Sequence, residues 1–423
     1  MKILVISNNC FAKNNSNGRI LGCLFKEFKK EDVSQIYIIP GTNDFDLCSN
    51  YYLVSDSMLA NAMRFNGTVG KVVTPEDIAT ANPKMSAYRS KYGRSSFTML
   101  CREMLWKSGL WWNDNLKNWI LDTKADVVVF QCGDAPFMYD IANKAAKLLN
   151  VPIVLFNTEY YYFLNESWMP VKDNNFFFGI YNKILKKKIK TAIDGAALSI
   201  YNSDWLKEHY QVAFTSDAEV IYQSSDYDNT SDLKDFVCPK ISYVGNLGFG
   251  RWEPLVEIAK AIQEINKDWQ LDVYGVVQTE DVLKLFEETE GLNYMGTVPY
   301  DKALEVIASS DLLILTENQR THFAKATEYG FSGKITDYLF SGIPVLAYGP
   351  ISNVGISYLS STKAAMVVTN KEELSTSIKT AVMDKEWRNI TVARALEIAN
   401  KNHDASKNAA SFRNYLQRVV GHE

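Results

Sequence analysis

Short apolar runs alternate with amphipathic stretches along most of this 423-residue chain. The runs at 125–130 and 151–156 are continuous, which is typical of strands buried on both faces. Between them, apolar residues recur at helical spacing over 139–149. Strands and helices that alternate in this way form a parallel sheet with helices on both faces. The pattern therefore predicts an α/β fold.

The alternation restarts in the second half of the chain. A strand at 240–245 leads into a glycine-rich loop and a helix, as the strand at 2–6 does near the N-terminus. Between the halves lies a polar stretch at 223–235, rich in Ser, Asp and Asn, which we predict to be a linker. The other predicted strands are 35–39, 196–201, 271–275, 292–296, 312–315 and 344–347.

We predict two Rossmann-like, doubly wound domains that face each other across a cleft. The first covers 1–222 and the second 236–400. Ligands of such sheets bind beyond the carboxyl ends of the strands. The tail at 403–423 carries a last helix at about 405–419. We assign this tail to the first domain, although its periodicity does not show where it packs.

Charge and cysteine content narrow the class of protein. Lys plus Arg is 45 and Asp plus Glu is 49, so the formal net charge of −4 argues against a surface that attracts nucleic acid. The six cysteines are scattered without a CxxC pair, which favours reduced thiols over disulfides or structural zinc. No apolar run reaches the ~18 residues of a membrane span, and the N-terminal run is too short for a signal peptide. We therefore expect a cytoplasmic protein.

The strongest local motif spans 329–345, where a turn containing Ser332 and Gly333 leads into a helix that begins near Lys334. Backbone N–H groups at a helix start favour an anion, and Lys334 adds a positive charge. Asp337 lies three residues on and can accept hydrogen bonds from ribose hydroxyls. One stretch could thus hold a diphosphate and a ribose. The alternative is an ordinary Lys–Asp surface pair on a capped helix.

A second motif covers 245–252, between a strand and a helix, where glycines let the backbone approach a ligand closely. Its spacing is neither GxGxxG nor that of a P-loop. Arg251 at its end could bind phosphate through two hydrogen bonds. The alternative is a flexible turn with a solvated arginine.

Together these motifs resemble a glycosyltransferase of the GT-B fold, family 4 type, as used in bacterial surface polysaccharide synthesis. Asn246 lies in the loop that begins the family's donor domain, and Arg251 holds the position of its basic residue facing the donor phosphates. Tyr300 ends a segment where the family's nucleotide base usually lies. The resemblance covers nearly the whole chain. The other matching residues are Ser332, Gly333, Lys334, Asp337, Tyr338, Gly342, Pro344 and Val345.

The chain departs from the family at two places. The family has paired glutamates eight residues apart, and the first would fall on Tyr329. Glu328 is one residue away and is the candidate to replace it through a local shift. The family often has a histidine after the strand at 151–156, where this chain has Asn157, Thr158 and Glu159 instead.

The resemblance implies a hexosyl- or other glycosyltransferase that moves a sugar from a nucleotide-sugar donor to a glycan or lipid-linked acceptor with retention. Preorganised positive charge would stabilise the leaving nucleotide diphosphate, so no metal or other cofactor is expected. The Asp-x-Asp spellings at 44–46 and 226–228 lie in loop-like stretches and offer few oxygen ligands. The expected catalytic residues are Arg251, Lys334 and Glu328, and the expected binding residues are Gly18, Asn246, Tyr300, Ser332, Gly333 and Asp337.

Gly18 belongs to the loop at 15–18, which would meet phosphate or acceptor in a GT-B cleft. The alternative is a simple Asn-Gly turn.

A basic cluster lies in the first half, preceded by phenylalanines at 176–178. A basic helix flanked by aromatic residues can rest on an anionic membrane, here the inner face. The alternative is a solvated basic face beside core phenylalanines. The lysines are Lys183, Lys186, Lys187, Lys188 and Lys190.

Two other functions remain open from the sequence. One is a nucleotide-sugar epimerase of the same fold. The other is a catalytically silent binding or scaffold protein, which the missing acid at position 329 would favour.

Overall fold

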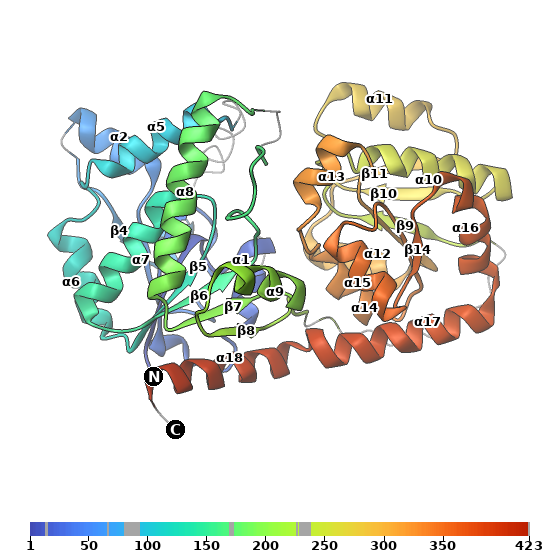
Figure 1. Ribbon diagram of the computed structural model, residues 1–423. Helices are drawn as coiled ribbons and strands as arrows, with labels where there is room; N and C mark the ends of the chain where they lie inside the picture. The colour runs from blue at the N-terminus through green and yellow to red at the C-terminus, as the bar shows by residue number, and fades with distance from the viewer. Residues whose placement is uncertain are drawn as a thin grey trace. The chain divides into compact units, whose positions relative to one another are not determined.

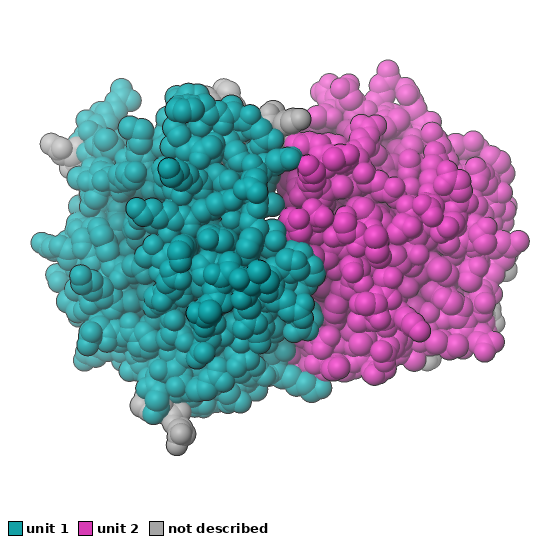
Figure 2. Space-filling view, viewed as in Figure 1, with its two compact units in different colours: residues 1–222, 405–423 teal, residues 223–404 magenta. Residues whose placement is uncertain are grey.

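The computed structural model describes residues 1–12, 16–65, 67–79, 94–168, 173–225, 227 and 238–421. They form two compact units (Figure 2). Unit 1 comprises Met1–Tyr222 and Ala405–Glu423, and unit 2 comprises Gln223–Asp404. Most of the predicted linker, residues 226 and 228–235, lies outside the described residues.

Unit 1 is built on an eight-stranded sheet of order β4-β3-β2-β1-β5-β6-β7-β8 (Figure 1). Every neighbouring pair is parallel except β3 and β4. From β1, the strands β2, β3 and β4 are added in turn towards one edge of the sheet. From β5, the strands β6, β7 and β8 are added towards the other edge, so the strand order reverses between β1 and β5. The strands are β1 (Ile3–Asn9), β2 (Val33–Ile39), β3 (Asn50–Leu53), β4 (Lys71–Val73), β5 (Val127–Gln131), β6 (Ile153–Asn157), β7 (Leu198–Tyr201) and β8 (Ala218–Val220).

Two apolar cores lie on opposite faces of this sheet. In β1, Leu4 and Ile6 join one core, while Ile3 and Val5 join the other. This explains the continuous apolar runs, because neither strand face meets water. Helices α2, α5, α6, α7, α8 and α9 supply the first core, and α1 and α18 the second. The helices are α1 (Ser16–Cys23), α2 (Asp56–Phe65), α3 (Pro75–Ala79), α5 (Ser96–Lys107), α6 (Asp114–Thr123), α7 (Pro136–Leu149), α8 (Phe176–Gly195), α9 (Asp204–Ala213) and α18 (Ala405–Val420).

Unit 2 repeats the plan with six parallel strands of order β11-β10-β9-β12-β13-β14. Helices again cover both faces, each over its own apolar core. The strands are β9 (Ile241–Val244), β10 (Leu271–Tyr274), β11 (Leu292–Gly296), β12 (Leu312–Thr316), β13 (Val345–Tyr348) and β14 (Met366–Val368). The helices are α10 (Trp252–Ile265), α11 (Glu280–Glu288), α12 (Tyr300–Ala308), α13 (Thr321–Thr327), α14 (Lys334–Phe340), α15 (Val354–Thr362), α16 (Leu374–Met383) and α17 (Lys385–Ile398).

The two doubly wound α/β sheets confirm the predicted fold class. All the predicted strands form, whereas the short strands β3, β4, β8 and β14 carried too little apolar pattern to be predicted. No helix in the described part of the chain is both long and apolar enough to cross a membrane.

The loop predicted at 15–18 is partly wrong, because α1 already begins at Ser16 and Gly18 is helical. A Cβ atom on Gly18 would lie 2.3 Å from the carbonyl oxygen of Cys10. The glycine therefore lets α1 pack directly on the segment that follows β1. Residues 13–15 lie outside the described residues.

The tail helix α18 packs into unit 1. Phe412 is fully buried, with its ring centroid 5.2 Å from that of Phe25 and 6.3 Å from that of Phe28. Leu416, one turn on, is buried in the same core. The C-terminal helix thus completes one face of a sheet whose strands all lie before residue 223.

Replacing Phe412 with Ala should therefore destabilise unit 1. A deleted core phenylalanine costs about 3 to 5 kcal/mol of unfolding free energy, because apolar burial is lost and a cavity remains. Chemical denaturation, followed by near-ultraviolet circular dichroism, measures the change. Asn414→Ala, at an exposed position on the same helix, should alter the unfolding free energy by less than about 0.5 kcal/mol. Equal effects of the two variants would contradict the packing role of α18.

Candidate functional site

The sheet of unit 2 reverses its order between β9 and β12. From β9, the chain adds β10 and β11 on one side, and then returns to place β12 against the other side of β9. The loops that follow β9 and β12 therefore diverge at the carboxyl ends of these strands, the position where open α/β sheets form a ligand-binding crevice. Arg251 ends the first loop, and Glu317 begins the second.

The loop after β9 has a fixed, unusual backbone. Gly245, Phe249 and Gly250 have positive φ values of 153°, 56° and 69°. Asn246 holds the turn, since its side-chain oxygen accepts a hydrogen bond of 2.7 Å from the Gly248 N–H. Asn318, from the loop after β12, donates a 2.7 Å hydrogen bond to the Gly250 carbonyl. The Asn318 bond ties the two loops together, and the Asn246 bond holds the turn within its own loop.

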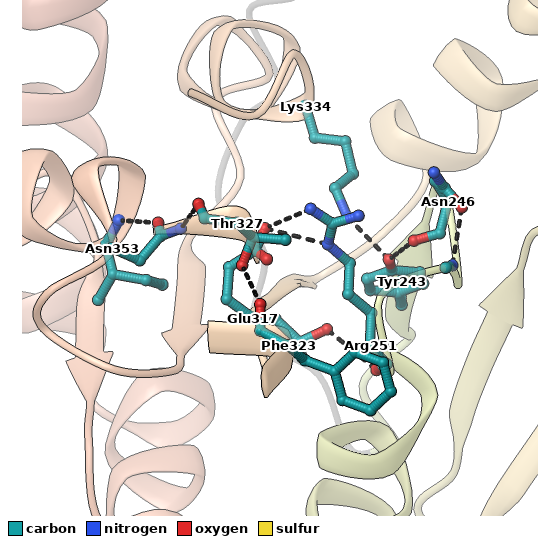
Figure 3. A network of polar contacts seen from close by, with 11 residues as sticks. Tyr243, Asn246, Arg251, Glu317, Phe323, Thr327, Lys334 and Asn353 are labelled. Carbon is teal, nitrogen blue, oxygen red and sulfur yellow. Dashed lines mark hydrogen bonds and ion pairs between the residues drawn. The ribbon is translucent and has the colours of Figure 1, made fainter. Parts of the chain in front are cut away.

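Arg251 and Glu317 form a buried ion pair across the crevice (Figure 3). Oε1 of Glu317 lies 3.0 Å from Nε and 2.9 Å from Nη2 of Arg251. The side chains are only 13% and 4% exposed, so Arg251 is not the solvated arginine of the alternative prediction. Oε2 of Glu317 is buried without a hydrogen-bond partner. The carboxylate thus fixes the guanidinium through one oxygen.

Lys334 extends from α14 across Gly245 to the same place (Figure 3). Its Nζ donates a 2.8 Å hydrogen bond to the Tyr243 hydroxyl and lies 4.2 Å from that ring's centroid. A Cβ atom on Gly245 would lie 2.5 Å from Cδ of Lys334, so only glycine leaves room for this path. Removal from water, and then the charge of Arg251, lower the pKa of Lys334 to about 7, against the opposing effect of Glu317.

Asp337 is buried and does not form the surface pair with Lys334 that the sequence left open. Its Oδ1 accepts a 2.6 Å hydrogen bond from Ser225 and one of 3.2 Å from Tyr300. Tyr300, predicted near the nucleotide base, thus lies beside the residue predicted to hold the ribose. The ribose contact stays a prediction, and it would require Asp337 to share or exchange these hydroxyl partners.

The turn before α14, predicted to bind an anion, leads into a short helix. The helix has seven residues, and the Ile335 N–H at its start already donates to the Ser332 carbonyl at 3.0 Å. Gly333 packs against Gln223, whose Nε2 would lie 2.6 Å from a Cβ at that position. The Ile335 N–H is therefore already paired, and anion binding at this turn stays a prediction.

Glu328 has no described contact with Arg251 or Lys334, and Gly18 belongs to the other unit. Glu328 ends α13, and no hydrogen bond or ion pair described for it reaches Arg251 or Lys334. Gly18 belongs to unit 1. The carboxylate that does contact Arg251 is Glu317, which the sequence analysis missed. The available signal was its position directly after a strand, since such residues face the ligand edge of the sheet.

A pocket of about 750 Å³ lies within unit 1, where its own strand order reverses between β1 and β5. Its wall carries amide, hydroxyl and charged side chains. Asp134 pairs with Arg94 and accepts a 3.0 Å hydrogen bond from the indole of Trp168. Arg102 donates to both oxygens of Asp56, each at 2.9 Å. Each arginine of the pocket is therefore matched by a carboxylate.

Glu159 is the remaining carboxyl of this pocket. It follows β6, at the position where the resemblance would place a histidine near 157–159. Part of the Glu159 side chain reaches solvent at the pocket surface. The surrounding protein still removes water from its carboxyl group, and this desolvation, followed by the charge of Asp134, raises the pKa of Glu159 to about 7. The surroundings of Glu159 thus favour its neutral form more than water does.

Within the described ranges, no group of three or more His, Cys, Asp or Glu side chains is arranged to hold a metal ion. Of the two Asp-x-Asp spellings, Asp226 and Asp228 lie outside the described residues. Asp44 is buried, and its Oδ1 accepts a 3.1 Å hydrogen bond from the Asp46 N–H.

No protein-family model and no curated protein sequence matches the chain. Solved structures do match along the whole length. HepE from Anabaena, in complex with UDP and glucose, aligns with a TM-score of 0.62 and 12% identity over 99% of this chain and 100% of its own. Sucrose-phosphate synthase from Thermosynechococcus elongatus aligns with a TM-score of 0.63 and 11% identity over 100% of both chains.

A glycosyltransferase from Rickettsia africae aligns with a TM-score of 0.56 and 13% identity, covering 100% of this chain and 99% of its own. At these identities the likeness establishes the fold. The chain therefore has the GT-B fold that its sequence predicted.

Glu317→Ala should destabilise unit 2 by about 3 to 5 kcal/mol of unfolding free energy, because it leaves the Arg251 charge buried and unpaired. The double variant Arg251→Met/Glu317→Leu removes both charges and should recover most of that loss. Denaturant titration measures both values. If the single and double variants were equally unstable, the ion pair would not be the interaction that holds this crevice together.

Proposed function

We propose that the protein is a glycosyltransferase that uses a nucleotide-sugar donor. The observation that carries this proposal is the convergence of Arg251 and Lys334 at the β9–β12 crevice of a GT-B fold. Two cations held in place before the reaction stabilise the charge that develops on a departing nucleotide diphosphate. Stabilisation by such preorganised charge is usually the largest single contribution to catalysis.

The charge balance of the crevice supports an anionic ligand. Arg251 and Lys334 share a single carboxylate, Glu317, so one positive charge has no counter-charge in this network. Removal of Lys334 from water, and then repulsion by Arg251, lower the pKa of Lys334. A diphosphate would supply the missing negative charge and make protonated Lys334 favourable again.

The fold neighbours suggest the first donor to test. HepE has been solved with UDP and with UDP-glucose. We therefore propose a uridine nucleotide and a hexose as the starting hypothesis, with Asp337 and Tyr300 near the nucleoside. Because Arg251 and Lys334 already supply positive charge at the leaving group, we propose transfer without a metal ion.

The pocket of unit 1 is proposed as the acceptor site. Its arginines are neutralised by Asp56 and Asp134, and amide and hydroxyl groups line the rest of the wall. A neutral, polyhydroxylated acceptor such as a glycan, or the sugar of a lipid-linked acceptor, can satisfy such groups with hydrogen bonds.

We propose a cytoplasmic role in polysaccharide synthesis and, from the sequence resemblance, retention of configuration.

Substitution of the two cations should impair donor binding and turnover. Lys334→Ala and Arg251→Ala should each lower kcat by about 100-fold or more, because leaving-group stabilisation is lost. A thermal-shift screen with UDP, GDP, ADP and TDP sugars identifies the donor, since a ligand that binds the native state raises its Tm. The matched control is Lys302→Ala, an exposed lysine of unit 2 that pairs with Glu305 and should behave as wild type.

Three outcomes would contradict the proposal. Unchanged turnover in both cation variants would reject the assigned residues. Isomerised nucleotide sugar formed without an acceptor would indicate an epimerase. A folded protein that binds no nucleotide sugar in the screen would indicate a binding or scaffold protein without this activity.

Donor binding should also take up a proton at Lys334. At pH 8, an amine with a pKa of about 7 is roughly one-tenth protonated, and a bound diphosphate raises that pKa. Calorimetric titration with UDP-glucose at pH 8, in buffers of different ionisation enthalpy, should show net uptake approaching one proton. Below about pH 6 the uptake should vanish, because Lys334 is already charged in the free protein.

Lys334→Arg is the matched control for this titration, since arginine stays charged throughout this pH range. It should bind UDP-glucose with little proton uptake at pH 8. If the variant took up as many protons as the wild type, another group would be responsible.

A further inference from the structure

Two neighbouring helices of unit 1, α5 and α8, leave large apolar side chains in solvent. On α5, Phe97 is 54% exposed and Met104 is 71% exposed. On α8, Phe176 is 76%, Phe177 40% and Ile180 38% exposed. The sequence analysis left open whether the phenylalanines at 176–178 lie in the core, and of these three only Phe178 is buried. Isolated exposed apolar residues are normal, but a contiguous set requires a partner.

These side chains form one patch, which we term the α5–α8 face. The two helices pack against each other and lie side by side in Figure 1. The rings of Phe97 and Phe177 meet edge to face with centroids 5.2 Å apart. Phe97 and Met104 are seven residues apart, and Phe176 and Ile180 four apart, so each pair lies along one side of its helix.

Lysines continue the apolar stripe along α8. Lys183 and Lys187 follow Phe176 and Ile180 at helical spacing, and both are exposed. Neither side chain has an ion-pair or hydrogen-bond partner among the described residues.

The remaining lysines of the basic cluster are already engaged. Lys186 donates to Asn165 at 2.8 Å, Lys188 pairs with Asp140, and Lys190 pairs with Asp194 at 2.7 Å. The structure thus divides the basic cluster into two free lysines beside the apolar stripe and three whose side chains bind neighbouring residues.

No exposed acidic side chain opposes this charge on the two helices. Glu103, the acid of α5, is buried and accepts a hydrogen bond from the Phe137 N–H. Asp194, the acid of α8, lies in the last turn and pairs with Lys190. A surface with exposed aromatic residues next to unopposed lysines complements the phosphate-rich interface of an anionic bilayer.

We propose that the α5–α8 face docks unit 1 onto an anionic lipid bilayer. Phe97, Met104 and Phe176 enter the interface between headgroups and acyl chains, while Lys183 and Lys187 contact lipid phosphates. The surface belongs to unit 1 alone and does not require the proposed transferase activity. If that activity holds, docking brings a lipid-linked acceptor to the unit that contains the acceptor pocket.

Sedimentation with vesicles tests the proposal on the full-length protein. Vesicles of phosphatidylcholine with about 30% phosphatidylglycerol should pellet the protein, and pure phosphatidylcholine vesicles should pellet much less. Phe176→Ser/Ile180→Ser and Lys183→Gln/Lys187→Gln should each weaken binding by about tenfold or more. Far-ultraviolet circular dichroism and thermal unfolding verify that the variants are folded. Wild-type binding by both double variants, or equal pelleting with neutral vesicles, would overturn the proposal.

Matched substitutions in unit 2 provide the control. Ile390 is 63% exposed on α17, and Lys379 is exposed on α16. Ile390→Ser and Lys379→Gln remove the same kinds of group from other surfaces and should leave vesicle binding unchanged. A loss of binding equal to that of the α5–α8 variants would show nonspecific adsorption and contradict the assigned face.

The chain's own cysteines report which face enters the lipid. Cys101 and Cys238 are the exposed thiols among the described residues, and Cys101 lies on α5 between Phe97 and Met104. An environment-sensitive fluorophore on Cys101, in a Cys238→Ser background, should shift to the blue with anionic vesicles. The same fluorophore on Cys238, in a Cys101→Ser background, should not.

Analytical ultracentrifugation without lipid distinguishes the competing occupant, a second copy of the chain. A concentration-dependent dimer that Phe176→Ser abolishes would assign the face to self-association and overturn the membrane proposal. A monomer at all concentrations supports it.

Discussion

The Arg251–Glu317 ion pair is the interaction on which the arrangement of the unit 2 crevice depends. It joins the loop after β9 to the loop after β12, at the one position in the sheet where neighbouring chain segments diverge. Its cost in desolvation is offset only if the geometry is exact enough for charge-assisted hydrogen bonds. The surrounding hydrogen bonds, one accepted by Asn246 and one donated by Asn318, together with left-handed backbone at Phe249, provide that geometry.

Lys334 makes this crevice different from a purely structural ion pair. The Lys334 side chain passes over Gly245 and donates a hydrogen bond to the Tyr243 hydroxyl. A second cation therefore lies near Glu317, the carboxylate that is already paired with Arg251. Burial first, and then the neighbouring charge of Arg251, lower the pKa of Lys334. The unit 1 pocket has the opposite character, because Arg94 and Arg102 each have a carboxylate of their own. An anionic donor suits the first environment, and a neutral polyhydroxylated acceptor suits the second.

Much of the fold was predictable because each core strand carries its own signal. Strands buried on both faces give continuous apolar runs, and the helices between them give stripes, so β1, β5, β9 and β12 could be found locally. Edge strands of three residues, such as β4 and β8, are too short to show either pattern. Helix α1 began earlier than predicted because Asn and Gly residues normally favour turns, whereas here close packing on Cys10 stabilises the helix.

The sequence by itself determined the α/β class, the restart that separates two Rossmann-like sheets, and the two motifs that contain Arg251 and Lys334. It could do so because these features depend on residues close together in the chain. Only the tertiary structure decided what those side chains face. Glu317 lies 66 residues from Arg251, and Tyr243 lies 91 residues from Lys334. It also decided which phenylalanines of α8 meet solvent and which lysines stay free, because exposure is set by the helices packed against them and not by local spacing.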